Sequence, residues 1–449
     1  MNSTSFQNFM EHESVKHASV GFSLMDASGQ LLYGQNEETS LAPASTQKLL
    51  TSITALELLG HDHRFTTTLS IQGTVADSIL IGNLVITSGG DPTFASVNFS
   101  EHYKNYFNEW LKALHAEGIN AVDGKVIVDD TFFKGDRHAG SSALDDVGNY
   151  YGAGAPAFSF MDNEFTVFFN TKEKGELSEV VRIEPHLPDG VRVINRVKSG
   201  NVSGDNVIIY SLDNSSEVFL TGQLPANQKG FTVRGAIPDV SLLAANYFTQ
   251  KFTEAELFIS EEERRGPLFK SSKEICRTKS PELINILKVL NRKSVNTYAD
   301  VMLKHIGKSY GKESSLSGGA RAVTDYWGSK GIDVSGVYIE DGSGLSRKNN
   351  VTAKFMTEVL AKVSDNEFLD EIMDESSKSG SVKAMWGGSY NGYLQAKSGY
   401  IGRVRAYSGY LIKNDIKYPF FFTINNYHGS SSAIRKQMGA VLKAVRNEL

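Results

Sequence analysis

Apolar and polar positions alternate in the first part of the chain. Segments 19–25 and 31–33 have this strand pattern, and residues 26–29 between them have turn chemistry, so the pattern predicts a β-hairpin. Residues 49–59 then form an apolar run with helical spacing that stops at Gly60, and Pro43 with the small residues after it fits the helix start. The opening of the chain therefore predicts a helix placed against a sheet.

The pattern changes after Gly60. It predicts strands at 65–71 and 83–87, a helix at 103–116 and another strand at 125–130. From residue 164 to residue 235 nearly every segment alternates like a strand, which predicts a small all-β module. Helical spacing returns at 238–252, at 281–290 and again after Asn296. We find no internal repeat and no low-complexity linker.

Helix-rich ends that enclose a β-rich middle indicate one domain interrupted by a long insertion. The insertion runs from about residue 60 to about residue 276, which is long enough for one domain or two. We expect an α/β (α+β) first domain made of both ends and two inserted domains. Their predicted ranges are 1–60 with 277–449, 61–163 with 236–276, and 164–235.

Composition and charge narrow the possible classes. The chain has 449 residues, of which 40% are hydrophobic and 22% are charged, as is ordinary for globular proteins. A net charge of -5 without a basic block argues against a nucleic-acid partner. The one cysteine, Cys276, excludes a disulfide framework within the chain, and the ten histidines lack metal-ligand spacing. We expect neither a metal nor a cofactor.

No targeting or membrane-spanning segment is recognisable. The sequence has no run of about 18 apolar residues, so we expect no transmembrane helix. Residues 1–9 lack the charged and apolar regions of a signal peptide. Two interpretations stay open: a cytoplasmic protein, or a processed form with an added Met.

The first candidate for chemistry is the S-x-x-K pair Ser45 and Lys48. In the first turn of a helix this spacing stacks the two side chains, so that the lysine amine reaches the serine hydroxyl. The helix N-terminus disfavours a protonated lysine and favours an oxyanion. A serine beside such a base is a nucleophile that needs no histidine. The structural alternative is a helix cap at Ser45 with a solvated Lys48.

A second S-x-x-K, Ser309 to Lys312, lies in the polar, glycine-containing segment 307–312, which we interpret as a loop. An S-x-x-K motif is weak evidence by itself, and its context separates the two copies. Only the copy at Ser45 opens an apolar helix, so we take Ser45 as the candidate nucleophile.

Two more motifs add polar groups. Ser294 and Asn296 lie between two predicted helices, where a hydroxyl and an amide can face a cleft. Lys397, Ser398 and Gly399 lie on the first of two strands, at 394–400 and 403–412. On a sheet edge Lys397 can hold a carboxylate that Ser398 hydrogen-bonds, and Gly399 allows a ligand backbone to approach. Both triplets recur elsewhere in the chain, so the evidence lies in the combination.

In this order, S-x-x-K, S-x-N and K-S-G resemble the motif set of the serine penicillin-recognising enzymes. Longer segments are similar to the class C low-molecular-mass penicillin-binding proteins, which are D-alanyl-D-alanine carboxypeptidases and endopeptidases of peptidoglycan. These segments are LAPASTQKLLTS at 41–52, GNLVITSGGDPT at 82–93, VDDTF at 128–132, YYGAGA at 150–155 and DGSGLSR at 341–347. The resemblance implies a β-lactamase/transpeptidase-like domain with a long insertion of two domains.

The resemblance also implies roles for the motif residues. Ser45 attacks the D-Ala-D-Ala carbonyl, Lys48 accepts the proton of the serine hydroxyl, and Ser294 relays a proton to the leaving amine. Asn296 orients Lys48 and the substrate amide. Lys397 and Ser398 bind the terminal carboxylate, and the N–H groups of Ser45 and Tyr400 form the oxyanion hole. Arg347 meets a side-chain carboxylate of the peptide stem, or is a solvated loop cation.

This sequence departs from the family pattern in several places. Ser398 stands where threonine is usual, Tyr400 stands where a smaller residue is common, and segment 164–235 aligns with nothing in the family. The expected partners are peptidoglycan stem peptides as substrates and β-lactams as covalent inhibitors, in the periplasm or otherwise outside the cytoplasm. The alternatives are a β-lactamase or esterase on the same scaffold, and a non-catalytic peptidoglycan-binding protein.

Overall fold

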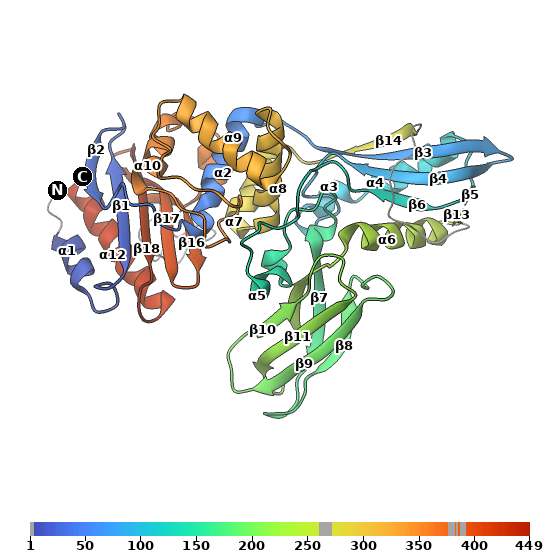
Figure 1. Ribbon diagram of the computed structural model, residues 1–449, viewed down its shortest axis with the longest axis horizontal. Helices are drawn as coiled ribbons and strands as arrows, with labels where there is room; N and C mark the ends of the chain where they lie inside the picture. Colours follow the sequence, from blue (N-terminus) through green and yellow to red (C-terminus); the bar gives the residue numbers. More distant parts are fainter. Residues whose placement is uncertain (1–3, 260–271, 376–381, 383–384, 387–391) are drawn as a thin grey trace. The chain divides into compact units, whose positions relative to one another are not determined.

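A computed structural model describes residues 4–259, 272–375, 382, 385–386 and 392–449 (Figure 1). The chain forms two compact units. Unit 1 contains Met1–His63, Ala139–Ser141 and Glu282–Leu449, and unit 2 contains Arg64–His138 and Ser142–Pro281. Both ends of the chain therefore build one unit, and the middle builds the other.

Unit 1 is built on a six-stranded antiparallel sheet. The strand order is β15-β16-β17-β18-β1-β2, so the first hairpin joins the last strands of the chain. The strands are β1 (Ser19–Met25), β2 (Leu31–Gln35), β15 (Asp374–Glu375), β16 (Leu394–Ile401), β17 (Val404–Lys413) and β18 (Ile416–Asn425). The predicted hairpin of β1 and β2 is confirmed.

Helices cover both faces of this sheet. Phe22 on β1 packs in an apolar cluster with α1 (Thr4–Glu11) and α12 (Ser431–Glu448). The next residue, Ser23, faces the other way and its hydroxyl lies 2.8 Å from the hydroxyl of Thr357 on α10 (Ala353–Lys362). Because side chains alternate along a strand, a single-residue step selects the face.

The remaining helices of unit 1 pack together. They are α2 (Gln47–Leu59), α7 (Leu283–Lys293), α8 (Asn296–Ser309), α9 (Leu316–Ser329) and α11 (Leu369–Ile372). The indole N–H of Trp327 on α9 donates to the Thr54 hydroxyl on α2 at 2.9 Å. A Cβ on Gly319 of α9 would lie 2.0 Å from the backbone oxygen of Leu303 on α8, so this glycine allows the two helices to touch.

Our interpretation of 307–312 as a loop was wrong for residues 307–309, which form the last turn of α8. Gly307 had suggested a helix breaker. In the structure a Cβ at this position would lie 2.5 Å from the backbone oxygen of Glu313. The glycine is therefore explained by close packing around the helix end.

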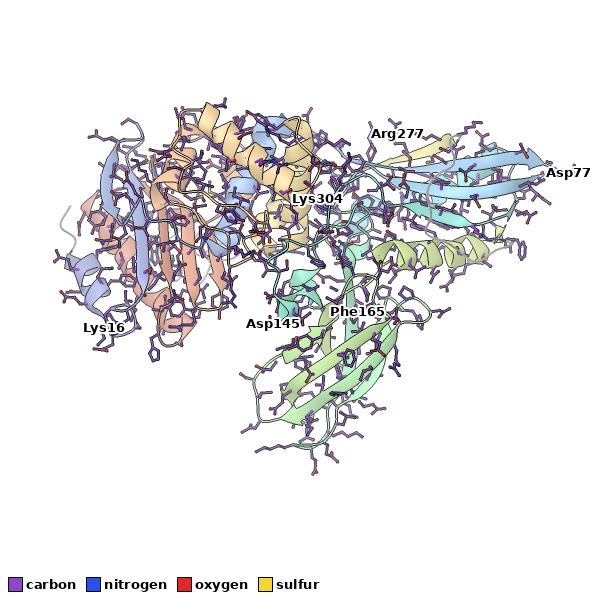
Figure 2. The ribbon with its side chains drawn as sticks, viewed as in Figure 1. Lys16, Asp77, Asp145, Phe165, Arg277 and Lys304 are labelled. Atoms are coloured by element: carbon purple, nitrogen blue, oxygen red, sulfur yellow. The ribbon has the colours of Figure 1, made fainter. Side chains whose placement is uncertain are left out.

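Unit 2 contains a second six-stranded sheet, in the order β13-β5-β4-β3-β14 with β6 paired to β4. Its strands are β3 (Thr66–Ala76), β4 (Ile79–Ser88), β5 (Ala121–Asp123), β6 (Val126–Asp129), β13 (Phe258–Ile259) and β14 (Lys273–Lys279). Asp77 lies at the turn between β3 and β4 (Figure 2). Packed with this sheet are α4 (Tyr106–Ala116) and α6 (Val240–Glu254), whose Trp110 and Phe248 rings lie 5.2 Å apart.

The rest of unit 2 is the all-β segment predicted at 164–235. Two three-stranded sheets, β12-β7-β8 and β10-β11-β9, are formed by β7 (Glu164–Asn170), β8 (Glu179–Glu184), β9 (Arg192–Gly200), β10 (Asn206–Tyr210), β11 (Glu217–Pro225) and β12 (Phe231–Ala236). One apolar cluster contains residues of this segment together with Trp110 and Phe248. The division of the insertion into two domains stays a prediction.

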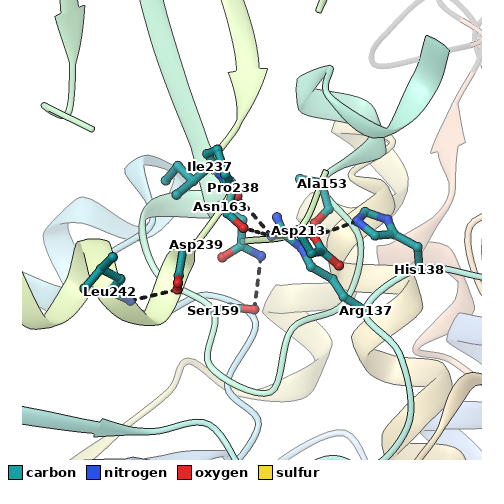
Figure 3. A network of polar contacts seen from close by, with 10 residues as sticks. All are labelled: Arg137, His138, Ala153, Ser159, Asn163, Asp213, Ile237, Pro238, Asp239 and Leu242. Carbon is teal, nitrogen blue, oxygen red and sulfur yellow. Dashed lines mark hydrogen bonds and ion pairs between the residues drawn. The ribbon is translucent and has the colours of Figure 1, made fainter. Parts of the chain in front are cut away.

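A buried arginine ties three segments of unit 2 together (Figure 3). The Arg137 side chain donates to the backbone oxygens of Ala153, at 2.5 Å, and Ile237, at 2.9 Å. Its guanidinium also pairs with Asp213 at 3.2 Å, and the same carboxylate oxygen lies 3.1 Å from Nε2 of His138. These contacts pair the arginine charge with a carboxylate and two backbone oxygens, while Nη2 has no hydrogen-bond partner among the described residues. The network therefore joins segments of unit 2.

Candidate active site

Ser45 lies in a short 3₁₀ turn, η1 (Ala44–Thr46), immediately before α2. The predicted start of the α-helix near Pro43 was wrong by one turn, because α2 begins at Gln47. Ala44 has a left-handed backbone with φ of 47°, which a right-handed helix does not accept. Ser45 and Lys48 can still face each other, because side chains three residues apart also lie one above the other in a 3₁₀ turn.

Two glycines, one on β16 and one in the loop 341–347, lie directly against this turn. A Cβ on Gly399 of β16 would lie 2.7 Å from the backbone oxygen of Pro43 and 3.0 Å from the backbone nitrogen of Ser45. A Cβ on Gly344 would lie 1.9 Å from the backbone oxygen of Ala44. The nucleophile turn is therefore clamped by direct backbone contact, which only glycine permits.

Lys48 is a buried amine in contact with the candidate nucleophile. Its Nζ donates to Ser45 Oγ at 2.9 Å and to the backbone oxygen of Ser343 at 2.7 Å. Its exposed fraction is 0%, so the alternative of a solvated Lys48 was wrong. Burial lowers the pKa of Lys48 to about 8, against the attraction of the Asp300 and Asp341 carboxylates. A larger share of neutral amine makes it a better base.

The loop that carries Ser343 is folded around Asp341. The Asp341 carboxylate accepts the backbone N–H of Gly344 at 2.6 Å and that of Ser346 at 2.7 Å. The amide of Asn349 donates to the same carboxylate at 2.9 Å. This buried network fixes the position of the backbone oxygen that accepts a hydrogen bond from Lys48.

The S-x-N and K-S-G motifs meet in the same unit. Ser294 ends α7 in a left-handed conformation, with φ of 57°, and α8 begins at Asn296. Lys397 is 2% exposed, and its Nζ donates to Ser294 Oγ at 3.1 Å and to the backbone oxygen of Ser398 at 2.8 Å. Left-handed conformations are costly for non-glycine residues and cluster at functional sites.

Strand β16 connects the two groups of polar contacts. Lys397 and Gly399 are two residues apart on this strand and so share one face. Gly399 contacts the backbone of the Ser45 turn, and Lys397 contacts Ser294. The three motifs, separated by hundreds of residues in the chain, are therefore assembled at one place in unit 1.

Lys397 lies beyond the pairing of a very short edge strand. Among the described residues, β15 pairs only with Gln395 and Ala396 of β16. At the far end of β16, Tyr400 is 52% exposed, and its ring lies 4.8 Å from the guanidinium carbon of Arg405. Lys397 is the first residue of β16 beyond those that pair with β15, so among the described residues it lies at the sheet edge, as expected.

Arg347 lies near the turn between β16 and β17. A Cβ on Gly402 in this turn would be 3.1 Å from an Nη atom of Arg347, and the arginine is exposed. The neighbouring Ser346 hydroxyl lies 2.6 Å from the hydroxyl of Ser141. The arginine is therefore solvated and also close to the strand that carries Lys397.

The motifs did not predict the residues next to Lys48. Ser343 belongs to the segment 341–347, which carries the family resemblance without a predicted role for this serine, and Asp300 belongs to none of the motifs. Asp300 follows Asn296 by four residues, so the two share a face of α8. A carboxylate one helical turn behind a motif residue, in an otherwise apolar stretch, was the available signal.

Among the described residues, no group of three or more His, Cys, Asp or Glu side chains is arranged to hold a metal ion. None of the described helices has the length and apolar character needed to cross a membrane.

Comparison with known proteins decides the family. A sequence profile of the D-Ala-D-Ala carboxypeptidase 3 (S13) family matches residues 3–445. The chain belongs to this S13 family. It is a serine-type peptidase, a hydrolase of the D-Ala-D-Ala carboxypeptidase class, and the resemblance to penicillin-binding proteins is confirmed.

Two curated relatives of this S13 chain carry related names. The "D-alanyl-D-alanine carboxypeptidase" of Actinomadura sp. (strain R39) is 24% identical over 453 residues, which cover 95% of this chain and 81% of the relative. The "D-alanyl-D-alanine carboxypeptidase DacB" of Haemophilus influenzae is 25% identical over 365 residues, which cover 78% and 72%.

Solved structures confirm the expected fold class. The crystal structure of penicillin binding protein 4 (dacB) from Haemophilus influenzae superposes with a TM-score of 0.85 at 21% identity, covering 100% of this chain and 99% of that one. A predatory peptidoglycan endopeptidase from Bdellovibrio bacteriovorus gives 0.53 at 17% identity, covering 96% and 93%. At these identities the likeness shows the fold alone: a penicillin-recognising α/β domain with extra β-rich regions.

Proposed function

We propose that this S13 peptidase is a D-alanyl-D-alanine carboxypeptidase and endopeptidase of peptidoglycan stem peptides, that it works through an acyl-enzyme on Ser45, and that β-lactams inhibit it. One observation carries the proposal. The buried Lys48 amine, whose pKa is lowered by burial, lies 2.9 Å from Ser45 Oγ. This is the nucleophile–base contact that acyl transfer needs.

In the acylation step Ser45 Oγ attacks the carbonyl carbon of the bond between the two D-Ala residues, and Lys48 Nζ takes the hydroxyl proton. Ser294, whose hydroxyl touches Lys397, relays a proton to the leaving amine. Asn296 at the start of α8 orients Lys48 and the substrate amide. Water then hydrolyses the ester on Ser45, which restores the enzyme.

The backbone N–H groups of Ser45 and Tyr400 form the oxyanion hole in this proposal. The close contact of Gly399 with the Ser45 nitrogen supports it, because Tyr400 directly follows Gly399 on β16. One such donor is typically worth about a hundred- to a thousandfold in rate. The glycine contact would therefore serve to align the two N–H groups.

Lys397 and Ser398 bind the terminal carboxylate of the substrate. The position of Lys397 supports this, since it shares a face of β16 with Gly399, which packs on the Ser45 turn, and its Nζ lies 3.1 Å from Ser294 Oγ. A β-lactam carries its carboxylate in the equivalent position, so the same pair would serve the inhibitor. Arg347, solvated and beside the end of β16, would meet a side-chain carboxylate of the stem.

Peptidoglycan lies outside the cytoplasm, so we propose an extracytoplasmic location. The S13 family and its DacB relative support this. The alternative of a non-catalytic binding protein is disfavoured because the nucleophile and its base are in contact. A β-lactamase or esterase would differ in turnover and in substrate.

The test is acylation by a fluorescent penicillin, followed by intact-mass measurement and peptide mapping. We expect one adduct, on Ser45, that persists for minutes or longer. Ser45→Ala should abolish labelling. Ser309→Ala is the matched control, because it removes the other S-x-x-K serine, and it should label normally.

An adduct at Ser309, or no adduct on the wild-type protein, would overturn the assignment. Rapid release of the adduct with turnover of the penicillin would favour the β-lactamase. Release of D-Ala from a peptide that ends in D-Ala-D-Ala, measured in the same preparation, separates the carboxypeptidase from the esterase.

A further inference from the structure

Three buried ionisable groups lie together behind Ser45. They are Lys48 on α2, Asp300 on α8 and Asp341 in the loop that carries Ser343. Their exposed fractions are 0%, 7% and 4%. The mechanism above uses only Lys48. Lys48 and Asp300 interact electrostatically, so the two groups do not titrate independently. The question is what the two acids do for the base.

Asp341 has a clear structural function. Its carboxylate accepts two backbone N–H groups and the Asn349 amide, which shapes the loop. Asp300 is different, because its Oδ1 is buried and no described residue donates a hydrogen bond to it. The loop packs directly on α8 beside Asp300, since a Cβ on Gly342 would lie 2.3 Å from the backbone oxygen of Ala299. The neighbouring Ser343 hydroxyl and backbone N–H favour the ionised form of Asp300 and so oppose the rise of its pKa. Ser343 in turn offers its backbone oxygen to Lys48 at 2.7 Å.

One oxygen of Asp300 is left without a partner. Oδ1 is buried and accepts no hydrogen bond from any described residue. An ionised carboxylate with an unpaired buried oxygen is costly, so this environment favours the protonated acid. Burial and the nearby Asp341 raise the pKa of Asp300, while Lys48 and the Ser343 donors oppose the shift.

We propose that Asp300 is a positioning residue for Lys48: it lies beside the loop of Ser343, whose backbone oxygen orients the amine, and its charge sets the pH at which the amine becomes neutral. The inference rests on the proposed function of Ser45 and Lys48. When Asp300 is protonated, the charge of Asp341 still favours the ammonium form of Lys48, but that of Asp300 no longer does. When Asp300 is ionised, it stabilises the ammonium form of Lys48, so the free amine forms only at higher pH.

The other charged groups around α8 have contacts elsewhere. From α2, Glu57 accepts the Tyr326 hydroxyl at 2.8 Å. On α9, Arg321 faces Glu313 and Asp325 pairs with Lys312. On α8 itself, Lys304, labelled in Figure 2, follows Asp300 by four residues and is buried, as is His305. Both have contacts of their own. The largest charge effects on Asp300 come from Asp341 and Lys48.

The experiment measures the second-order rate constant of acylation by a fluorescent penicillin against pH. Asp300→Asn keeps the size of the side chain and removes its charge. We expect the midpoint of the acidic limb to move to lower pH by about one unit, the scale of shift that one nearby charge produces. A merely structural role would lower the rate at every pH and leave the midpoint where it is.

Asp91→Asn is the matched control. Asp91 is also a buried acid with a raised pKa due to burial, but it lies in unit 2 and bonds to Thr93 and Tyr103. It should leave the midpoint unchanged. A folded Asp300→Asn protein with the wild-type midpoint would overturn the inference.

If Asp300→Asn does not fold, Ser343→Ala decides the matter. It removes the hydroxyl that favours ionised Asp300 and keeps the backbone oxygen that contacts Lys48. The acid then stays protonated to higher pH, so the midpoint should again move down, by a smaller amount; an unchanged midpoint would refute the inference. A wild-type protein that is not acylated at all would instead refute the proposed function, and this inference with it.

Discussion

Replacing Gly399 by alanine tests whether β16 positions the nucleophile. The added Cβ would lie 2.7 Å from the backbone oxygen of Pro43, and 3.0 Å from the backbone nitrogens of Ser45 and Thr46. Ordinary contact begins at 3.4 Å, so the strand and the turn must separate by up to 0.7 Å (3.4 − 2.7). All three opposing atoms are backbone atoms, which cannot rotate away as a side chain would.

The expected cost is mainly kinetic. A misplacement of about 1 Å in a catalytic group is typically worth about a hundredfold in rate, or about 2.7 kcal/mol of activation free energy. Overpacking also destabilises a protein, typically by about 1–3 kcal/mol. We therefore expect Gly399→Ala to acylate about a hundredfold more slowly than wild type and to unfold at a lower temperature.

The assay is the second-order rate constant with a fluorescent penicillin, with thermal unfolding measured in parallel. Gly328→Ala on α9 is the control, because a Cβ there meets only ordinary contacts at 3.6 Å. It should keep the wild-type rate and gain about 0.5–1 kcal/mol of stability, as glycine-to-alanine changes do within helices. A Gly399→Ala protein with wild-type rate and unfolding temperature would show that the clamp described above does not position Ser45.

The other predictions concern charge. Lys48→Ala should lower the rate of acylation by about a hundred- to ten-thousandfold, the usual contribution of a general base, while circular dichroism stays unchanged; near wild-type labelling would require a different base. Lys397→Ala should lose about ten- to a hundredfold on peptides with a free terminal carboxylate and nothing on amidated ones, which D-Ala release distinguishes; equal losses would remove Lys397 as the anchor. Arg347→Ala should weaken hydrolysis of stems that carry a side-chain carboxylate but leave penicillin acylation unchanged, and reduced acylation would contradict the assigned contact. The wild-type acylation rate should rise with pH and level off near the lowered pKa of Lys48, about 8, because the neutral amine is the active form; a rise that continued to the ordinary value of 10.5 would show that burial does not shift this lysine.

Local patterns predicted most of the elements. Alternation identified β1, β2 and the strands of segment 164–235, and helical spacing identified α2 and α6. The three motifs could be found because each combines a few residue types at short spacing. The failures were local as well. Helix α8 continues through Gly307, which packing explains, and the helix after Ser45 begins one turn later than expected because Ala44 adopts a left-handed conformation.

What the sequence determined by itself is the set of reacting groups: Ser45 three residues from Lys48, a serine and an amide between two helices, and a lysine that opens K-S-G on a strand. These relations span few residues, so backbone geometry alone carries them. Only the tertiary structure decided which buried groups surround them. Ser343 and Asp300 reach Lys48 from segments about 250–300 residues away in the chain, and no short-range pattern encodes such contacts. The proton affinity of Lys48 follows from burial and from these neighbours, so the chemistry of the amine is a property of the fold.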